Sequence, residues 1–269
     1  MRETDAIGRT TGLPPTVSSL AADLVALGVP RGGLVLVHSS LRALGWVVGG
    51  PEAVVAALLD ALGPEGTLVV PSFSTGRTDP ARWQRPPVPE SWWPVIRAET
   101  PAFDPRVSST RSMGAIVDCV LRWPGAVRGP HPHISFAAVG PRAALVEDHP
   151  LDASLGDASP LGRLYELDAH VLLLGVGHLN NTSLHLAEAR ASFAGKTYYD
   201  EGAAVLVDGR REWVTFRELD TDDSDFPDIG AAFDATGAVT VGPVGAGEAR
   251  LMRQRTLVDF AVGEIERRR

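Results

Sequence analysis

The chain has 269 residues, 44% of them hydrophobic and 22% charged, with a net charge of −8 at pH 7 when histidines are neutral. This length and composition predict a globular protein with a core to bury, and the single cysteine excludes an intramolecular disulfide and a thiolate cluster for zinc. The acidic balance disfavours nucleic acid as a partner, because phosphate binding needs clustered lysine and arginine, and it favours a cationic partner.

Targeting and membrane signals are absent from the sequence pattern. No apolar run of about 18 residues occurs, and the first ten residues lack the basic segment and apolar stretch of an export signal. We therefore expect a cytoplasmic protein with no membrane attachment.

The first part of the chain alternates helical and strand patterns. Thr16 caps a helix whose apolar positions share one face and which ends at Gly28. Gly33–Val37 predicts a buried strand, Glu52–Leu62 an apolar helix and Thr67–Val70 a second strand. This order is a βαβ unit, so the pattern predicts an α/β fold with a central mixed or parallel sheet flanked by helices.

The remaining elements are less regular. Residues 72–106 are rich in proline and hold three of the six tryptophans, which predicts an extended surface excursion or lid. Further elements are expected at Met113–Trp123 (helix), Ile134–Val139 (strand), Val171–Leu174 (strand) and Thr182–Phe193 (helix). From about Ala203 we predict a smaller C-terminal portion with two strands, an acidic loop and a final helix near Thr256–Arg267.

The segment that follows Val171–Leu174 places a histidine at the start of a predicted helix, where it is suited to act as a general base. Asn181 or Thr182 is a good helix cap, which puts His185 in the first turn and Glu188 on the same face. A helix N-terminus disfavours protonation of an imidazole, and a neutral imidazole is what a general base must be. A hydrogen-bonded structural histidine is the alternative interpretation.

A catalytic imidazole needs a carboxylate to orient it. We take Glu218 for this role and keep Glu188 and Asp220 as alternatives, either for orientation or for gripping ammonium groups. Glu218 and Asp220 begin the acidic run RELDTDDSDF, which predicts either a solvated turn or an acidic wall for a polyamine.

Rival chemistries have weaker patterns. HPH at 131–133 and EDH at 147–149 lack the spacing of a metal site, so we predict no metal. Ser39 and Ser40 stand at a strand end but outside a G-x-S-x-G motif, and Cys119 lies on an apolar helix face. No phosphate-binding glycine motif occurs, which argues against a dinucleotide cofactor.

Several segments, in order along nearly the whole chain, resemble the aminoglycoside 3-N-acetyltransferase family, whose fold differs from the common N-acetyltransferase fold. They are VHSSLRALGWVVGGPEAVVAALLDALGPEGTLVVPSFS (37–74), RSMGAI (111–116), HPHISFAAVGPRAALVEDHPLD (131–152), LGDASPLGRLYELDAHVLLLGVGHLNNTSLHLAE (155–188) and the tail RLMRQRTLVDFAVGEIERR. The resemblance implies a single acetyltransferase domain over residues 1–269, monomeric or homodimeric. It implies transfer of an acetyl group from acetyl-CoA to the 3-amino group of a 2-deoxystreptamine ring, which confers antibiotic resistance.

The resemblance also implies roles for individual residues. His185 is the catalytic base. The acetyl-CoA contacts are His38, Ser39, Ser40, Leu41, Ser74, Ser109, Thr110, Met113 and Gly114. It places Asp157 near the cationic substrate, and from their acidic side chains we expect Glu188, Asp220, Asp222 and Asp223 to contact that substrate as well.

The predicted mechanism is direct attack of the amine on the thioester, because no good covalent nucleophile is present. We expect backbone N–H groups near Ser40 and Leu41 to hold the oxyanion. Two alternatives stay open: the same chemistry on a different primary amine, and a non-catalytic scaffold that binds acyl-CoA.

Overall fold

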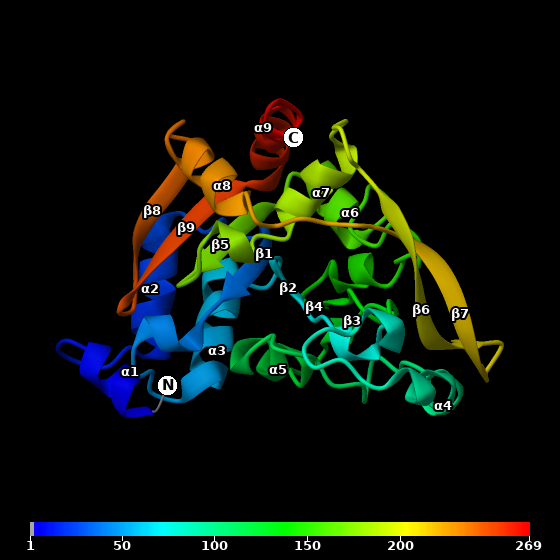
Figure 1. The fold of residues 1–269 in the computed structure, drawn as a ribbon. Coiled ribbons are helices and arrows are strands. Elements are labelled where there is room, and N and C mark those ends of the chain that lie inside the picture. Colours follow the sequence, from blue (N-terminus) through cyan, green and yellow to red (C-terminus); the bar gives the residue numbers. More distant parts are fainter. Residues whose placement is uncertain (1–2) are drawn as a thin grey trace.

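The computed structural model describes residues 3–269; residues 1 and 2 of the predicted domain lie outside the described residues. Within the described residues, a central sheet has seven strands: β1 (Leu34–Ser39), β2 (Thr67–Pro71), β3 (Val127–Arg128), β4 (Phe136–Val139), β5 (His170–Leu174), β8 (Val239–Val244) and β9 (Gly247–Arg253). Their order is β3-β4-β2-β1-β5-β9-β8 (Figure 1). The strand β1 runs parallel to β2 and β5, and the other pairs are antiparallel. The prediction of an α/β fold with a mixed sheet is therefore confirmed.

Helices cover both faces of this sheet. One face packs against α2 (Val17–Leu27), α3 (Gly50–Leu62) and α5 (Ala115–Leu121). The other face packs against α6 (Pro160–Glu166), α7 (Ser183–Arg190), α8 (Phe226–Asp234) and α9 (Gln254–Arg268). Alternate residues of β1 enter the two cores, because successive side chains of a strand point to opposite faces. Two short helices, α1 (Glu3–Arg9) and α4 (Trp93–Glu99), lie outside these layers.

Local signals explain where the first helices begin and end. Thr16 and Ser19 form a capping box at the start of α2, and Gly28 adopts φ +101° at its end, a conformation that glycine tolerates best. Proline in the first turn of α3 costs no hydrogen bond there. These helices confirm the predicted βαβ unit.

A long hairpin, β6 (Tyr198–Val207) and β7 (Arg210–Leu219), forms a separate two-stranded sheet that flanks the main body (Figure 1). It is attached to the segment 72–106. Phe103 N donates to Ala204 O at 2.8 Å, and Asp79 N donates to a carboxylate oxygen of Glu201 at 2.7 Å. The predicted excursion is thus a wall packed on the hairpin, and it contains the regular helix α4.

Part of the C-terminal portion differs from the prediction. Residues 226–253, for which no regular structure was predicted, contribute α8 and the strands β8 and β9 of the main sheet. The pattern is weak there because β8 contains Gly242 and Pro243, which favour turns and edge strands. Among the described residues, no helix combines the length and apolar character needed to cross a membrane.

Candidate active site

The candidate site lies where β1 and β5 end. These strands are parallel, with Ser39 opposite Leu174, so their carboxyl ends meet at the edge where open α/β sheets usually bind ligands. Gly175 follows β5 with φ +70°, and a Cβ there would lie 2.4 Å from Ala43 Cβ. Glycine therefore lets the chain leave β5 close to the end of β1 and continue toward α7.

The start of α7 follows the predicted cap pattern. Asn181 Oδ1 accepts a hydrogen bond from Ser183 N at 3.2 Å, which satisfies one of the free N–H groups of the first turn. Thr182 makes no side-chain cap; its Oγ1 lies 3.3 Å from His38 Nε2. His185 N bonds to Thr182 O at 3.1 Å, so His185 lies in the first turn of α7.

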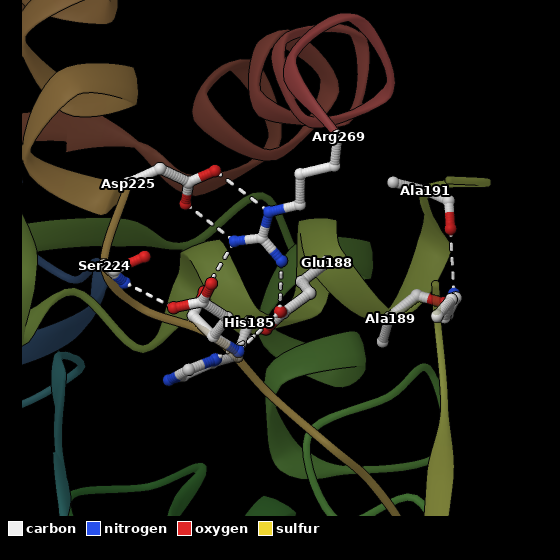
Figure 2. A network of polar contacts seen from close by, with 9 residues as sticks. His185, Glu188, Ala189, Ala191, Ser224, Asp225 and Arg269 are labelled. Carbon is white, nitrogen blue, oxygen red and sulfur yellow. Dashed lines mark hydrogen bonds and ion pairs between the residues drawn. The ribbon is translucent and has the colours of Figure 1, made fainter. Parts of the chain in front are cut away.

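His185 is paired with Glu188 on the same helix. The distance from His185 Nδ1 to Glu188 Oε2 is 3.0 Å, and Glu188 is fully buried (Figure 2). Glu188 Oε1 accepts hydrogen bonds from Asp222 N at 2.8 Å and Arg269 Nη1 at 2.5 Å. The ring of Phe226 packs 4.7 Å from the imidazole, centroid to centroid. Both orientation and position of the imidazole are thereby fixed.

This pairing defines the tautomer of His185. An ionised carboxylate only accepts hydrogen bonds, so Nδ1 must carry the proton that is donated to Glu188. The lone pair then resides on Nε2, which makes His185 suited to accept a proton from a bound substrate.

His185 borders a cavity of about 240 Å³. The structure brings five of the predicted site residues to this cavity: His38, Ser39, Met113, His185 and Asp223. Burial, assisted by the charge of the nearby His185, lowers the pKa of His38 to about 3, so His38 is neutral at pH 7. Among the described residues, the buried hydroxyl of Ser39 has no hydrogen-bond partner.

A second cavity of about 290 Å³ lies between the main body and the hairpin. Its wall includes the acidic side chains of Asp157, Glu201 and Glu218. Ser154 donates to Glu218 Oε2 from both its N and its Oγ, at 3.3 and 3.0 Å. Burial, assisted by the charges of Glu201 and Asp152, raises the pKa of Glu218 to about 7, because it outweighs the two hydrogen bonds from Ser154 that favour the charged form.

Three buried histidines lie behind Glu218. The rings of His131 and His149 are 4.6 Å apart, and those of His131 and His133 are 6.0 Å apart. Burial lowers the pKa of His131 to about 4 and those of His133 and His149 to about 3. His131 Nε2 and His149 Nε2 bond to the carbonyl oxygens of Leu151 and Ser154, so these rings support the loop. Within residues 3–269, no group of three or more His, Cys, Asp or Glu could hold a metal ion.

Two sequence-based assignments of glutamates need correction. Glu218 does not orient His185; it bonds to Ser154 in the second cavity, and Glu188 is the carboxylate at the imidazole. Glu188 in turn cannot contact a substrate, because it is fully buried and both its oxygens are occupied. Sequence spacing could not show which glutamate contacts His185. Glu188 is on the same helix as His185, whereas Glu218 is on the strand β7, and its position depends on how the hairpin packs.

The predicted oxyanion donor at Ser40 is also wrong. Its backbone N–H already donates to Leu174 O at 2.9 Å, which joins β1 to β5. Leu41 begins the short 3₁₀ turn Leu41–Leu44, and its backbone N–H, the other predicted donor, stays a prediction. The serine that offers a free hydroxyl at the cavity is Ser39.

The other predicted acetyl-CoA contacts do not border the His185 cavity and lie in different places. Ser109 and Thr110 line a different cavity of about 840 Å³ beside α5. Gly114 is the residue before α5, and a Cβ there would meet open space. Ser74 is buried, and its hydroxyl accepts a hydrogen bond from Arg128 at 2.6 Å, so the structure does not place it in an open ligand contact.

The other predicted acidic contacts also differ in availability. Asp223 lines the His185 cavity, and Asp157 lines the second cavity while paired with Arg190 at 2.7 Å. Asp220 is exposed and lies 3.6 Å from Arg82. The carboxylate of Asp222 accepts a hydrogen bond from Ser224 N, which lowers its pKa.

Sequence reasoning missed several residues of the site. Glu201, Tyr199 and Ser154 belong to the second cavity, and Arg269 contacts Glu188. Alternation in β6 puts Glu201 on the same face as Tyr199, which pairs with Glu218 across the hairpin. No local pattern links Arg269 to Glu188, because 81 positions separate them.

The fold and the histidine–carboxylate pair at a strand-end cavity define a site for base-assisted transfer. The family model described as "Aminoglycoside 3-N-acetyltransferase" matches residues 36–266, and the chain belongs to this family. The prediction of an acetyl-CoA-dependent acyltransferase is confirmed at the level of the family.

Two curated relatives match over almost their full length. The "SPbeta prophage-derived aminoglycoside N(3')-acetyltransferase-like protein YokD" of Bacillus subtilis (strain 168) is 42% identical, with 95% of this chain and 94% of the relative covered. The "Aminoglycoside N(3)-acetyltransferase VII" of Streptomyces paromomycinus is 40% identical, with 99% and 96% covered.

Solved structures agree with the fold. The crystal structure of YokD superposes with a TM-score of 0.95 at 40% identity, covering 98% of each chain. AAC-IIIb in a binary complex with CoASH has a TM-score of 0.85 at 31% identity, with 94% of this chain and 97% of the other covered. AAC-VIa bound to sisomicin has a TM-score of 0.85 at 32% identity, with 95% and 99% covered.

Proposed function

We propose that this chain transfers the acetyl group of acetyl-CoA to the 3-amino group of an aminoglycoside built on 2-deoxystreptamine. The observation that carries the proposal is the pair His185–Glu188 at the cavity where β1 and β5 end. The structures of AAC-IIIb with CoASH and AAC-VIa with sisomicin, which share this fold, support both substrates.

The reaction needs a base because an ammonium group has no lone pair. The ammonium group loses one proton to solvent, and His185 Nε2 takes a second proton from the nitrogen as the nitrogen forms its bond to the thioester carbonyl carbon. The carbon–sulfur bond breaks as the tetrahedral intermediate collapses, and the imidazolium returns the proton to the departing thiolate. Glu188 stabilises the imidazolium while it exists, through its contact with Nδ1.

Ser39 is our candidate for the donor to the thioester carbonyl oxygen. Its hydroxyl is free among the described residues, and Ser39 borders the same cavity as His185. A hydrogen bond there strengthens as negative charge develops on the oxygen in the transition state.

The acceptor occupies the two cavities together. Thr221 borders the larger acidic one and Asp223 borders the His185 cavity, so the segment between them joins the two spaces. Asp223, Asp157 and Glu218 then face the ammonium groups of the polyamine. Since Glu218 comes from the hairpin and Asp157 from the main body, we propose that the chain works as one domain.

The acetyl-CoA arm extends away from His185 along residues 109–114. Met113 borders the reaction cavity, whereas Ser109 and Thr110 border the cavity beside α5. This outer cavity also includes Arg122, whose exposed guanidinium suits the phosphates of the nucleotide end. Because the reaction consumes acetyl-CoA, we place the protein in the cytoplasm; monomer and homodimer stay equal proposals.

No acetyl-enzyme forms in this mechanism. Cys119 is buried in the core between α3, α5 and the sheet, and its burial raises the pKa of the thiol, which makes it a poor nucleophile. Mass spectrometry after incubation with acetyl-CoA alone should find no acetylated peptide; an acetylated Ser39, Ser40 or Cys119 would contradict direct transfer.

The test of function is release of free thiol from acetyl-CoA. The panel contains 2-deoxystreptamine aminoglycosides with a free 3-amino group, a streptidine-based aminoglycoside and simple primary amines. Turnover with the first group alone, with NMR placing the acetyl group on the 3-amino nitrogen, is the expected result. Turnover with simple amines alone would favour a different acceptor, and acetyl-CoA binding without turnover would favour a scaffold.

A further inference from the structure

The guanidinium of Arg269 lies at the back of the His185–Glu188 pair. Its Nη1 is 2.5 Å from Glu188 Oε1, and its Nε and Nη2 lie 2.9 and 2.6 Å from the two carboxylate oxygens of Asp225 (Figure 2). Nη2 also lies 2.5 Å from Asp222 O. With only 13% of its side chain exposed, Arg269 is held on several sides.

The contact with Arg269 offsets part of the cost of burying the charge of Glu188. A carboxylate with no solvent exposure is costly to ionise unless a cation and hydrogen bonds compensate it. Apart from His185, Arg269 is the only cationic side chain in an ion pair with Glu188 among the described residues. Lys196, which is nearby, is engaged by the carbonyl oxygens of Ala189 and Ala191 at the end of α7.

We propose that Arg269 is a positioning residue for the acetyl transfer: it holds the carboxylate of Glu188 aimed at His185 Nδ1, and its positive charge opposes that of Glu188 beside the imidazole. This inference rests on the proposed function of the pair. Asp225 has a supporting part, since its two oxygens hold the guanidinium in place.

The charges around His185 set the direction of the effect. Those facing it are Glu188 on α7, His38 at the end of β1, Asp223 in the loop before α8, and Arg269 behind Glu188. Since His38 is neutral at pH 7, loss of Arg269 removes the cation that is ion-paired with Glu188 and leaves only the weaker, longer-range interaction of Glu188 with Lys196 among the described residues. The imidazole of His185 then gains a proton more readily, and a protonated imidazole cannot act as the base.

The chain offers a matched control two residues earlier, in the last turn of α9. Arg267 is 65% exposed and pairs with Glu264, not with Glu188. Arg267→Gln therefore removes the same charge at nearly the same distance along the chain, without touching the pair. Arg269→Lys keeps the charge but loses the two-pronged contact with Asp225.

The experiment measures kcat against pH, the KM for acetyl-CoA and the melting temperature for Arg269→Gln, Arg269→Lys and Arg267→Gln. For Arg269→Gln we expect kcat at pH 7 to fall roughly 10- to 100-fold. The acidic limb of the profile should move to higher pH by about one unit, with the KM for acetyl-CoA changed less than about twofold. Arg269→Lys should recover part of the activity, and Arg267→Gln should match the parent.

A second readout does not depend on turnover. Titration of the His185 ring by NMR should show its midpoint moving to higher pH in Arg269→Gln and not in Arg267→Gln. An unmoved midpoint and an unmoved kcat profile in folded Arg269→Gln would overturn the inference. Absence of turnover in the parent protein together with a moved midpoint would instead overturn the proposed function alone.

Discussion

Glu188 and Glu218 are both buried, but the groups around Glu188 stabilise a charged carboxylate, whereas those around Glu218 do so less well. Glu188 meets a guanidinium, a backbone N–H and an imidazole. Glu218 accepts hydrogen bonds from the N–H and hydroxyl of Ser154 and lies 3.6 Å from the neutral imidazole of His131, and its pKa rises to about 7. The first is therefore suited to hold a charged imidazole, and the second to gain its charge when an ammonium group binds.

The His185→Ala substitution tests the base directly. We expect kcat to fall about 100- to 10,000-fold, the usual contribution of a general base, while acetyl-CoA binding measured by calorimetry survives. A loss smaller than about fivefold would exclude the role.

The serines of the HSSLR segment form a natural pair of test and control. Ser39→Ala removes a free hydroxyl at the reaction cavity, so kcat should fall roughly 100-fold, as for other oxyanion donors. Ser40→Ala keeps the backbone bond to Leu174 O, and its hydroxyl makes no cap at the 3₁₀ turn, so kcat should stay within about threefold of the parent. Equal losses in both variants would point to general disturbance of the loop.

At the scale of elements, the site contacts within one helix can be predicted from the sequence, and the contacts between segments that are distant in the chain cannot. The cap at Asn181 and the i, i+3 spacing of His185 and Glu188 are local, so the sequence places the dyad residues on one helix. The pairing of Glu188 with Arg269 and the role of Glu218 depend on how α9 and the hairpin dock, which no periodicity encodes.

The helix α8 shows why part of the fold escaped prediction. Phe226, Ile229 and Phe233 follow helical spacing, but Gly230 lies in the middle of the helix, where glycine lowers helix propensity. The reason for the glycine is tertiary: a Cβ at Gly230 would lie 2.0 Å from Cγ of His178, in the turn that precedes α7. Glycine at this position therefore lets α8 pack closely against the turn at His178, although it lowers the helix propensity of α8.

Gly230→Ala should therefore destabilise the protein by about 1 to 3 kcal/mol, the usual range for overpacking, and lower kcat by shifting the turn before His185. Gly263, on α9, is the control, because a Cβ there would meet no atom within 4 Å. Gly263→Ala should stabilise by up to about 1 kcal/mol, since alanine favours a helix. Urea unfolding of both variants gives the comparison; a Gly230→Ala protein as stable as the parent would contradict the packing argument.

At the scale of the whole molecule, the sheet gathers charge and polarity at one edge. The strands β1 and β5 bring His38 and the α7 loop together, while the hairpin and segment 72–106 close the acidic side. The net charge of −8 then has a local meaning, because acidic side chains line the cavities where a polycation is proposed to bind. Composition alone predicted the sign of the partner but not its location.

The same architecture makes stability depend on pH. Burial lowers the pKa of His38, His133 and His149 to about 3 and that of His131 to about 4. Below pH 6.5 these histidines therefore bind protons in the unfolded chain but stay neutral in the folded chain, and the free energy of unfolding falls as the pH falls. Glu218, whose pKa is raised from 4.5 to about 7, makes the free energy of unfolding rise as the pH falls through this range. Its single effect is smaller than the sum of the four histidines.

Each buried histidine should cost about 1.4 kcal/mol per pH unit once the pH is well below 6.5. We expect the free energy of unfolding to decrease by roughly 2 to 4 kcal/mol between pH 6 and pH 5, after Glu218 has offset part of the loss. His149→Gln, whose amide can still donate to Ser154 O, removes one titrating group and should reduce this decrease by about 1.4 kcal/mol. Urea unfolding at the two pH values measures both; a parent protein equally stable at pH 6 and pH 5 would show that the buried histidines do not govern acid unfolding.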